Sequence, residues 1–152
     1  METVAEFLAG KGTAVYTVKP EATVYEALEL MADKNIGAVL VTDQSGKLAG
    51  ILSERDYARK MMIKGRDSHS TKVKEIMTTL VVSINPETRL RDCMSLMTEK
   101  RIRHLPVFAG DRLAGVVSIG DVVKSLLTEQ DYVISQQAYK IDQLENYISL
   151  SP

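Results

Sequence analysis

One short phrase occurs twice in this 152-residue chain. LAGILSERD spans residues 48–56 and LAGVVSIGD spans residues 113–121, with glycine, serine and aspartate at the same spacing. The likeness extends upstream, because TVKPEATVYEALELMADKNIGAVLV begins at Thr17 and SINPETRLRDCMSLMTEKRIRHLPV begins at Ser83. Self-similarity of this length indicates two copies of one supersecondary unit, and we expect them to pack face to face because neither has a comfortable core alone.

Each copy predicts the same order of elements. A short β run, AVYTV (14–18) or LVVSI (80–84), leads through Pro-Glu to a helix with apolar residues at three and four spacing. Two further β runs follow across a turn rich in Asp, Ser and Gly, and a second helix starts at SERDYARKMM or SIGDVVKSLL. The sequence thus predicts an α+β fold of two β-α-β-β-α repeats, packed pseudo-symmetrically, with a C-terminal helix.

The domain boundaries follow from this pattern. We expect a first repeat with an N-terminal helical segment at 1–70, a second repeat at 71–130 and an amphipathic C-terminal helix at 131–152. The last segment carries an apolar stripe at helical spacing, formed by Ile134, Ala138, Ile141, Leu144 and Ile148. The stripe packs either on the body or on a second chain, and we favour self-association because little further protein remains to cover it.

Composition excludes several classes of function. Lysine and arginine total 19 against 20 acidic residues, so no net field favours nucleic acid or an anionic membrane. No apolar run approaches the roughly 20 residues of a membrane span, and the start lacks signal-peptide character, so we expect a cytoplasmic protein. With one cysteine, Cys93, and two histidines at unrelated positions, the sequence predicts no metal site and no catalytic residues.

The repeated phrase has two physical interpretations. Ser53 and Asp56, like Ser118 and Asp121, are three residues apart at a strand-to-helix turn, which is the spacing of a capping box. A helix start also offers free N–H groups and a positive dipole to an anion, while a carboxylate just inside it can accept hydrogen bonds from the two hydroxyls of a ribose. On the residues alone, capping is the simpler interpretation and a nucleotide site stays open.

The whole pattern resembles a known family. Two units that each close with G-h-h-S-x-x-D, at 50–56 and 115–121, resemble a tandem pair of CBS domains, often called a Bateman module. SERDYARK, KEIMT, LMTEKRIRHLPV and VSIGDVV further resemble the small stand-alone bacterial CBS-pair proteins. This resemblance implies clefts between the repeats that bind AMP, ADP, ATP or NAD, no metal, and dimerisation through helices.

The resemblance also implies roles for particular residues. Asp56 and Asp121 would accept the ribose hydroxyls, Ser53 and Ser118 would donate near ribose or phosphate, and the backbone around Thr17 and Ser83 would meet the adenine. The residues around the start of the second β run of each copy would line the same clefts. They are Ile36, Gly37 and Ala38 in the first copy and Ile102, Arg103, His104 and Pro106 in the second.

The two copies differ in charge, which predicts unequal sites. Arg103 and His104 stand where the first copy has Gly37 and Ala38, and a guanidinium suits phosphate because its planar fork donates two hydrogen bonds. Arg55 is a further phosphate candidate, since a cation in the first turn of a helix opposes the dipole and needs another reason. The sequence leaves open which aspartate shares a cleft with Arg103 and His104.

We therefore expect a non-enzymatic regulatory module that binds an adenosyl nucleotide and signals by conformational change. The expected partners are a second copy of the chain and an unidentified target protein, with no nucleic acid and no membrane. A ligand-free dimerisation or interaction scaffold, with Ser and Asp kept as caps, is the alternative. The sequence indicates neither which adenosyl ligand binds nor whether both clefts are filled.

Overall fold

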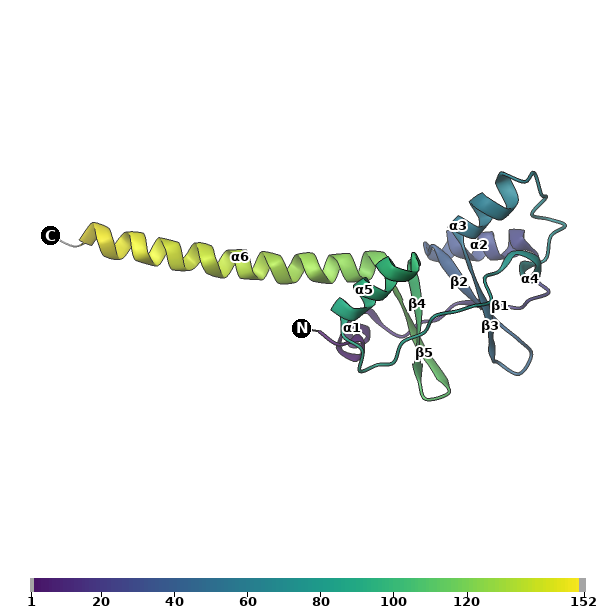
Figure 1. Ribbon diagram of the computed structural model, residues 1–152, viewed down its shortest axis with the longest axis horizontal. Coiled ribbons are helices and arrows are strands. Elements are labelled where there is room, and N and C mark those ends of the chain that lie inside the picture. The colour runs from purple at the N-terminus through teal and green to yellow at the C-terminus, as the bar shows by residue number, and fades with distance from the viewer. Residues whose placement is uncertain (1, 151–152) are drawn as a thin grey trace.

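The computed structural model describes residues 2–150, without the side chains of Glu129, Tyr132, Ser149 and Leu150. Residues 151–152 of the expected C-terminal helix lie outside the described chain. The first half comprises α1 (Val4–Lys11), β1 (Thr17–Val18), α2 (Val24–Lys34), β2 (Ala38–Thr42), β3 (Leu48–Ser53), α3 (Glu54–Tyr57) and the π-helical turn η1 (Ala58–Met62). The second half comprises α4 (Val73–Ile76), α5 (Leu90–Lys100), β4 (His104–Ala109), β5 (Arg112–Ser118) and α6 (Ile119–Leu150) (Figure 1).

The expected α+β architecture is confirmed. In the first repeat β1 pairs parallel with β2 and β2 pairs antiparallel with β3, whereas the second repeat has the antiparallel pair β4–β5. The long helix of each repeat follows Pro-Glu, as the sequence predicts, and Thr23 and Glu26 form a capping box at the start of α2. Each of these helices ends in a residue of left-handed conformation, Asn35 after α2 and Arg101 after α5.

The expected strand LVVSI is wrong for the second repeat. Ile84 makes only one isolated parallel bridge, to Val107 of β4. In the first repeat the N–H of Leu40 donates to the carbonyl of Tyr16 over 3.2 Å, and the residue equivalent to Leu40 is Pro106. Proline has no N–H to donate, so this ladder bond cannot form and the third strand is reduced to a single bridge.

The short helices α1 and α4 exchange repeats. Val4 and Leu8 of α1 lie in the core of the second repeat, whereas Val73 and Ile76 of α4 lie in the core of the first. The N–H of Val4 donates to the carbonyl of Thr88 over 2.8 Å, close to the start of α5. Residues 1–70 are therefore not one packing unit in space, because α1 completes the second core.

The same exchange occurs at the start of the first repeat's helix. The N–H of Val24 donates to the carbonyl of Thr71, and the N–H of Val73 donates to the carbonyl of Ala22, each over 2.8 Å. Cys93 is a fully buried member of the second core, and burial raises the pKa of its thiol to about 11. Each repeat thus completes its core with the segment that precedes the other one.

The last helix is longer than expected. The helix that begins with SIGD continues without a break to Leu150, so the end of the second repeat and the C-terminal helix are one 32-residue element. Figure 1 shows α6 leaving the body and extending away from both repeats.

Gly50 provides a direct test of the exchange. A Cβ at this position would lie 2.7 Å from the carbonyl oxygen of Thr78, which also accepts the N–H of Ile51 from β3. We expect Gly50→Ala to lower the free energy of unfolding by about 1–3 kcal/mol, because this backbone contact must open. Urea unfolding measures it.

Gly10→Ala is the matched control, since a Cβ there meets no atom within 4 Å. Alanine has a higher helix propensity than glycine, so this variant should be as stable as the wild type or more stable. Equal destabilisation by both substitutions would contradict the packing described here.

Candidate functional site

A cleft of about 830 Å³ lies between the two repeats. Its lining comes from equivalent parts of both: the turn that follows each long helix, and the start of the helix that follows each closing strand. The end of α1 and the segment after α4 also reach it. The repeat symmetry therefore brings both copies of the G-h-h-S-x-x-D phrase to one opening.

Most of the residues singled out in the sequence meet in this cleft. Eleven of the fourteen line it, namely Ile36, Gly37, Ala38, Ser53, Arg55, Asp56, Ile102, Arg103, His104, Ser118 and Asp121. Asp56 and Asp121 therefore share one opening with Arg103 and His104, which answers a question the sequence left open.

Three of the fourteen are not among the lining residues. Thr17 and Ser83 are exposed, and their neighbours Tyr16 and Val82 line the cleft instead. Successive side chains of an extended segment point to opposite sides, so a shift of one residue changes the side. Pro106 is buried within β4, although its counterpart Leu40 does reach the cleft.

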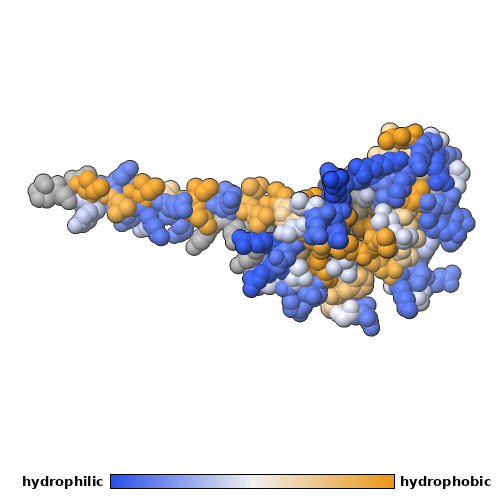
Figure 2. Space-filling model, viewed as in Figure 1, coloured by the Kyte–Doolittle hydropathy of each residue, from blue (hydrophilic) through white to orange (hydrophobic). Residues whose placement is uncertain are grey.

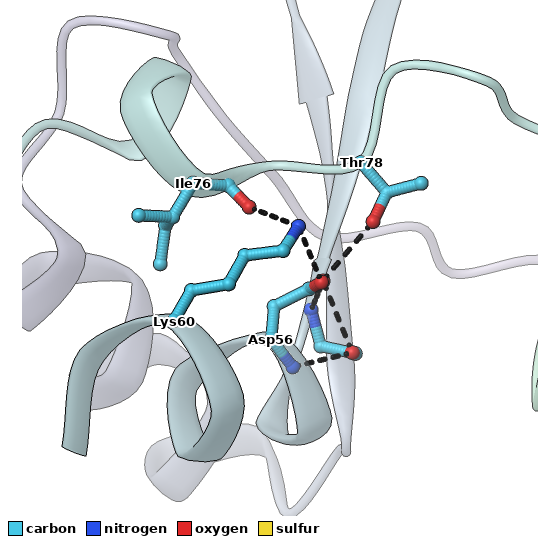
Figure 3. Close-up of polar contacts among 5 residues, drawn as sticks. Asp56, Lys60, Ile76 and Thr78 are labelled. Atoms are coloured by element: carbon cyan, nitrogen blue, oxygen red, sulfur yellow. Dashed lines mark hydrogen bonds and ion pairs between the residues drawn. The ribbon is translucent and has the colours of Figure 1, made fainter. Parts of the chain in front are cut away.

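Asp56 accepts hydrogen bonds at both of its carboxylate oxygens. Oδ2 accepts the N–H and the hydroxyl of Ser53 over 3.0 and 3.1 Å, and Oδ1 accepts the hydroxyl of Thr78 over 3.1 Å. Lys60, one turn further along, places its ammonium 2.9 Å from Oδ1 and also donates to the carbonyl of Ile76 (Figure 3). The capping box predicted for Ser53 and Asp56 is confirmed.

Asp121 makes the same cap with different support. Its Oδ2 accepts the N–H of Ser118 over 2.9 Å, while the hydroxyl of Ser118 accepts the N–H of Asp121 over 3.2 Å. The ammonium of Lys11, at the end of α1, lies 2.6 Å from the same Oδ2. Burial raises the pKa of the Asp121 carboxyl, but the bonds from Lys11 and Ser118 outweigh it, so the pKa lies below its usual range.

The two carboxylates are therefore unequal despite the repeat. Both oxygens of Asp56 accept hydrogen bonds, whereas Oδ1 of Asp121 accepts none from the described residues. An ionised carboxylate oxygen that faces a cleft can accept hydroxyl hydrogen bonds from a ligand without first releasing an internal donor. Asp121 is better placed for a ligand than Asp56.

His104 of the second repeat packs against the first repeat at the cleft. A Cβ on Gly37 would lie 3.5 Å from Nε2 of His104, so the imidazole packs where the first repeat has no side chain. Burial lowers the pKa of His104; nearby Asp121 raises it, while Lys11 and Arg103 lower it further. The net effect favours a neutral ring, with one nitrogen that donates and one that accepts.

The residues that line the cleft carry a net positive charge, whereas the whole chain has a formal net charge of -1. Six lysine and arginine side chains line it against three carboxylates: Lys11, Arg55, Arg59, Lys60, Arg101 and Arg103 against Glu54, Asp56 and Asp121. Nζ of Lys11 and the guanidinium of Arg55 also bond to main-chain carbonyls, those of Val116 and Arg101. An opening with this balance of charge favours an anion.

Sequence reasoning missed several of these residues. Lys60 carries a readable signal, because it lies four residues after Asp56, where helical side chains meet. Lys11 carries no such signal, because it lies 110 residues before Asp121 and reaches it only through the exchange of α1. Thr78 comes to Asp56 in the same way, through α4.

The described residues give no sign of two other kinds of site. Among the side chains that the structure describes, no three His, Cys, Asp or Glu residues gather as a metal ion would need. Over the same residues, no helix combines the length and the apolar character needed to cross a bilayer.

Comparison with known proteins is consistent with this geometry. The CBS domain model matches residues 12–63 and again residues 73–128, so the chain belongs to the CBS-domain family and carries a tandem pair. The CBS domain-containing protein CBSX3 of Arabidopsis thaliana is 46% identical over 111 residues, which are 70% of this chain and 54% of that protein. This chain thus matches only about half the length of that relative.

Two solved structures extend the comparison. A protein with CBS domains from Burkholderia ambifaria is 48% identical with a TM-score of 0.80, over 85% of this chain and 96% of that one. The CBS-CP12 protein of bloom-forming cyanobacteria, which is hexameric, is 30% identical with a TM-score of 0.73, over 81% of this chain and 70% of that one. The fold is thus that of regulatory CBS-pair proteins, and such proteins form oligomers.

His104 predicts a pH dependence of stability. Its folded pKa is depressed, so between that value and the ordinary value near 6.5 the unfolded chain binds a proton that the folded chain does not. The wild type should therefore lose stability as pH falls from 6.5 through the folded pKa. His104→Asn should lose less over this window, measured by urea unfolding at pH 7.5 and 5.5.

His69→Asn is the control, because it removes the other histidine, in an exposed loop outside the cleft. This variant should follow the wild type across the same window. A wild-type slope that His104→Asn leaves unchanged would show that burial of this imidazole does not control stability here.

Proposed function

We propose that the chain is a non-enzymatic regulatory module that binds an adenosyl nucleotide in the cleft between its repeats. One observation carries the proposal: the aspartates of both helix caps and six lysine and arginine side chains line one cleft of about 830 Å³ between the repeats. That volume is within the range of pockets that enclose ligands of this size. A ribose supplies vicinal hydroxyls for a carboxylate, and phosphates supply negative charge for the lysines and arginines.

In this proposal the ribose binds at Asp121. Its Oδ1 accepts no hydrogen bond from the described residues, whereas a ribose at Asp56 must displace Lys60 or Thr78. Phosphates would lie toward Arg55 and Arg103, which approach the cleft from different repeats. AMP, ADP, ATP and NAD all present these groups, and the number of phosphates that the arginines accommodate decides among them.

Signalling would follow from contact with both repeats. A nucleotide held by Asp121 and Arg55 bridges the two units, so it favours whichever relative orientation binds it more tightly and shifts the population toward it. A homodimer in the cytoplasm, with a target protein that reads its shape, is the proposed setting. Catalysis would instead need a nucleophile with an adjacent base, and two equivalent capping aspartates support binding rather than turnover.

A ligand-free interaction scaffold is the second candidate. It is favoured by the state of Asp56, whose two oxygens are both engaged by Ser53, Thr78 and Lys60 as in a purely structural cap. If Asp121 likewise served only its cap and Lys11, the cleft would need no nucleotide.

Thermal unfolding separates the two candidates. AMP, ADP, ATP and NAD are tested separately, and binding at about 100 times the dissociation constant should add roughly 2.7 kcal/mol and raise the midpoint. We expect a rise with at least one of them. No rise with any, from protein freed of carried-over nucleotide, would favour the scaffold, and chromatography showing conversion of the nucleotide would favour an enzyme.

The two aspartates should respond differently to substitution. Asp121→Asn should weaken nucleotide binding about tenfold or more, with a smaller loss of stability, because Ser118 still caps the helix and an amide oxygen can still accept the N–H of Ser118. Asp56→Asn should cost about 1–3 kcal/mol of stability, because the partly buried donors around it lose a charged acceptor. Titration calorimetry and urea unfolding measure the two effects.

Asp111→Asn is the control for charge, since this exposed aspartate lies in the β4–β5 turn outside the cleft lining. It should change neither quantity appreciably. Equal loss of affinity in the Asp111 and Asp121 variants would mean that net charge, and not the ribose contact, governs binding.

A further inference from the structure

The distal part of α6 has no cover from its own chain. Val122 is fully buried and Leu126 packs against the second core, and Ser125 donates to Glu2 over 2.7 Å. From Leu127 to Ile148, which we call the projecting segment, every described side chain is exposed. The CBS domain match ends at residue 128, so all but the first two residues of this segment lie beyond the matched domains.

Large apolar residues recur at every seventh position of the projecting segment. Leu127, Ile134, Ile141 and Ile148 follow one another at intervals of seven, and each is between 55% and 68% exposed. With these four residues at position a, position d carries Gln130, Gln137 and Leu144. Apolar residues spaced seven apart drift slowly around a straight helix of 3.6 residues per turn. This spacing therefore favours a left-handed two-helix coiled coil over packing on a globular body.

A single helix of this kind also needs a partner to be stable. An isolated helix is only marginally stable in water. Figure 2 shows apolar side chains along the extended helix, where a partner could cover them. A second copy of the same chain supplies a helix with the same seven-residue spacing, so its a and d side chains match layer for layer.

Charge fixes the orientation of the pair. Within the projecting segment the charged residues at positions e and g are Asp131 and Glu145 at e and Lys140 at g; the other residues at these positions are Ala138, Val133 and Tyr147. In a parallel pair g of one helix faces e of the next heptad on the other, which sets Lys140 against Glu145 of the partner copy. An antiparallel pair faces e with e and g with g, where only like charges are available.

We propose that two copies of this chain associate through the projecting segment of α6 as a parallel, in-register coiled coil. The proposal names the surface of the homodimer proposed above. Gln130 and Gln137 then face their own counterparts, where paired amides fix the register at some cost in stability. Because α6 starts at the cleft with Asp121, the coiled coil continues the same helix that would hold the ligand.

Engineered cysteines test the surface and its orientation together. In a parallel pair two Gln137→Cys side chains meet at one d layer, so mild oxidation should link most of the dimer. Tyr139→Cys is the matched control. Position 139 lies on the opposite side of the helix from positions a and d, which form the seam of the coiled coil, so this cysteine should link poorly. Native Cys93 is fully buried and should not react in either protein.

Substitution of the seam tests its contribution to assembly. Ile134→Asn with Ile141→Asn should raise the dimer dissociation constant by about a hundredfold or more, whereas Tyr139→Asn removes an equally exposed apolar side chain and should not. Sedimentation velocity over a range of concentrations measures both. The seam variant should keep its melting rise with nucleotide, because the cleft is intact.

Two results would overturn the proposal. One is a wild-type chain that stays monomeric at millimolar concentration, and the other is a dimer in which Gln137→Cys links no better than Tyr139→Cys. Failure of nucleotide binding leaves a different signature, because the cysteine link would form normally while no nucleotide raised the melting midpoint. The two proposals therefore fail separately.

Discussion

Close contact at two equivalent glycines holds the two repeats together. At Gly50 the segment after α4 lies against β3, and at Gly115 the side chain of Leu8 from α1 takes the space of a Cβ. Each contact is made by a segment that precedes the other repeat in the chain, so neither unit has a complete core without its neighbour. The same segments carry Thr78 to Asp56 and Lys11 to Asp121, so the site depends on the exchange as much as the core does.

The helix caps and the proposed ligand contacts use the same carboxylates. A capping side chain contributes about 0.5–2 kcal/mol, so serine and aspartate would be retained at these turns even without a ligand. What distinguishes a site from a cap is the remaining acceptor capacity and the surrounding charge. Asp121 retains an oxygen without a donor from the described residues, and the cleft around it is rich in arginine and lysine. The repeat thus gave two similar caps, and local contacts made them unequal.

Much of the fold was predictable because the repeat could be read by simple alignment. The α+β architecture and the cap at Ser53 depend on local patterns, and the structure has them. Contacts between distant segments leave no local pattern, which is why the pairing of Lys11 with Asp121 could not be foreseen. The strand expected at LVVSI failed for a specific reason, since the effect of Pro106 appears only when its pairing partner is known. The prediction that the backbone around Thr17 and Ser83 meets the adenine stays a prediction; the side chains that line the cleft there belong to the adjacent Tyr16 and Val82.

Calorimetric titration of the 152-residue chain with ATP, AMP and inorganic tripolyphosphate tests the central claim most directly. Tripolyphosphate carries the charge of a nucleotide's phosphates without ribose or adenine, so it separates a nucleotide site from a merely cationic cleft. The account predicts saturable binding of at least one adenosyl ligand, markedly tighter than that of tripolyphosphate. Equal affinity for tripolyphosphate, or no binding of either nucleotide, would contradict a site built around the ribose contact of Asp121.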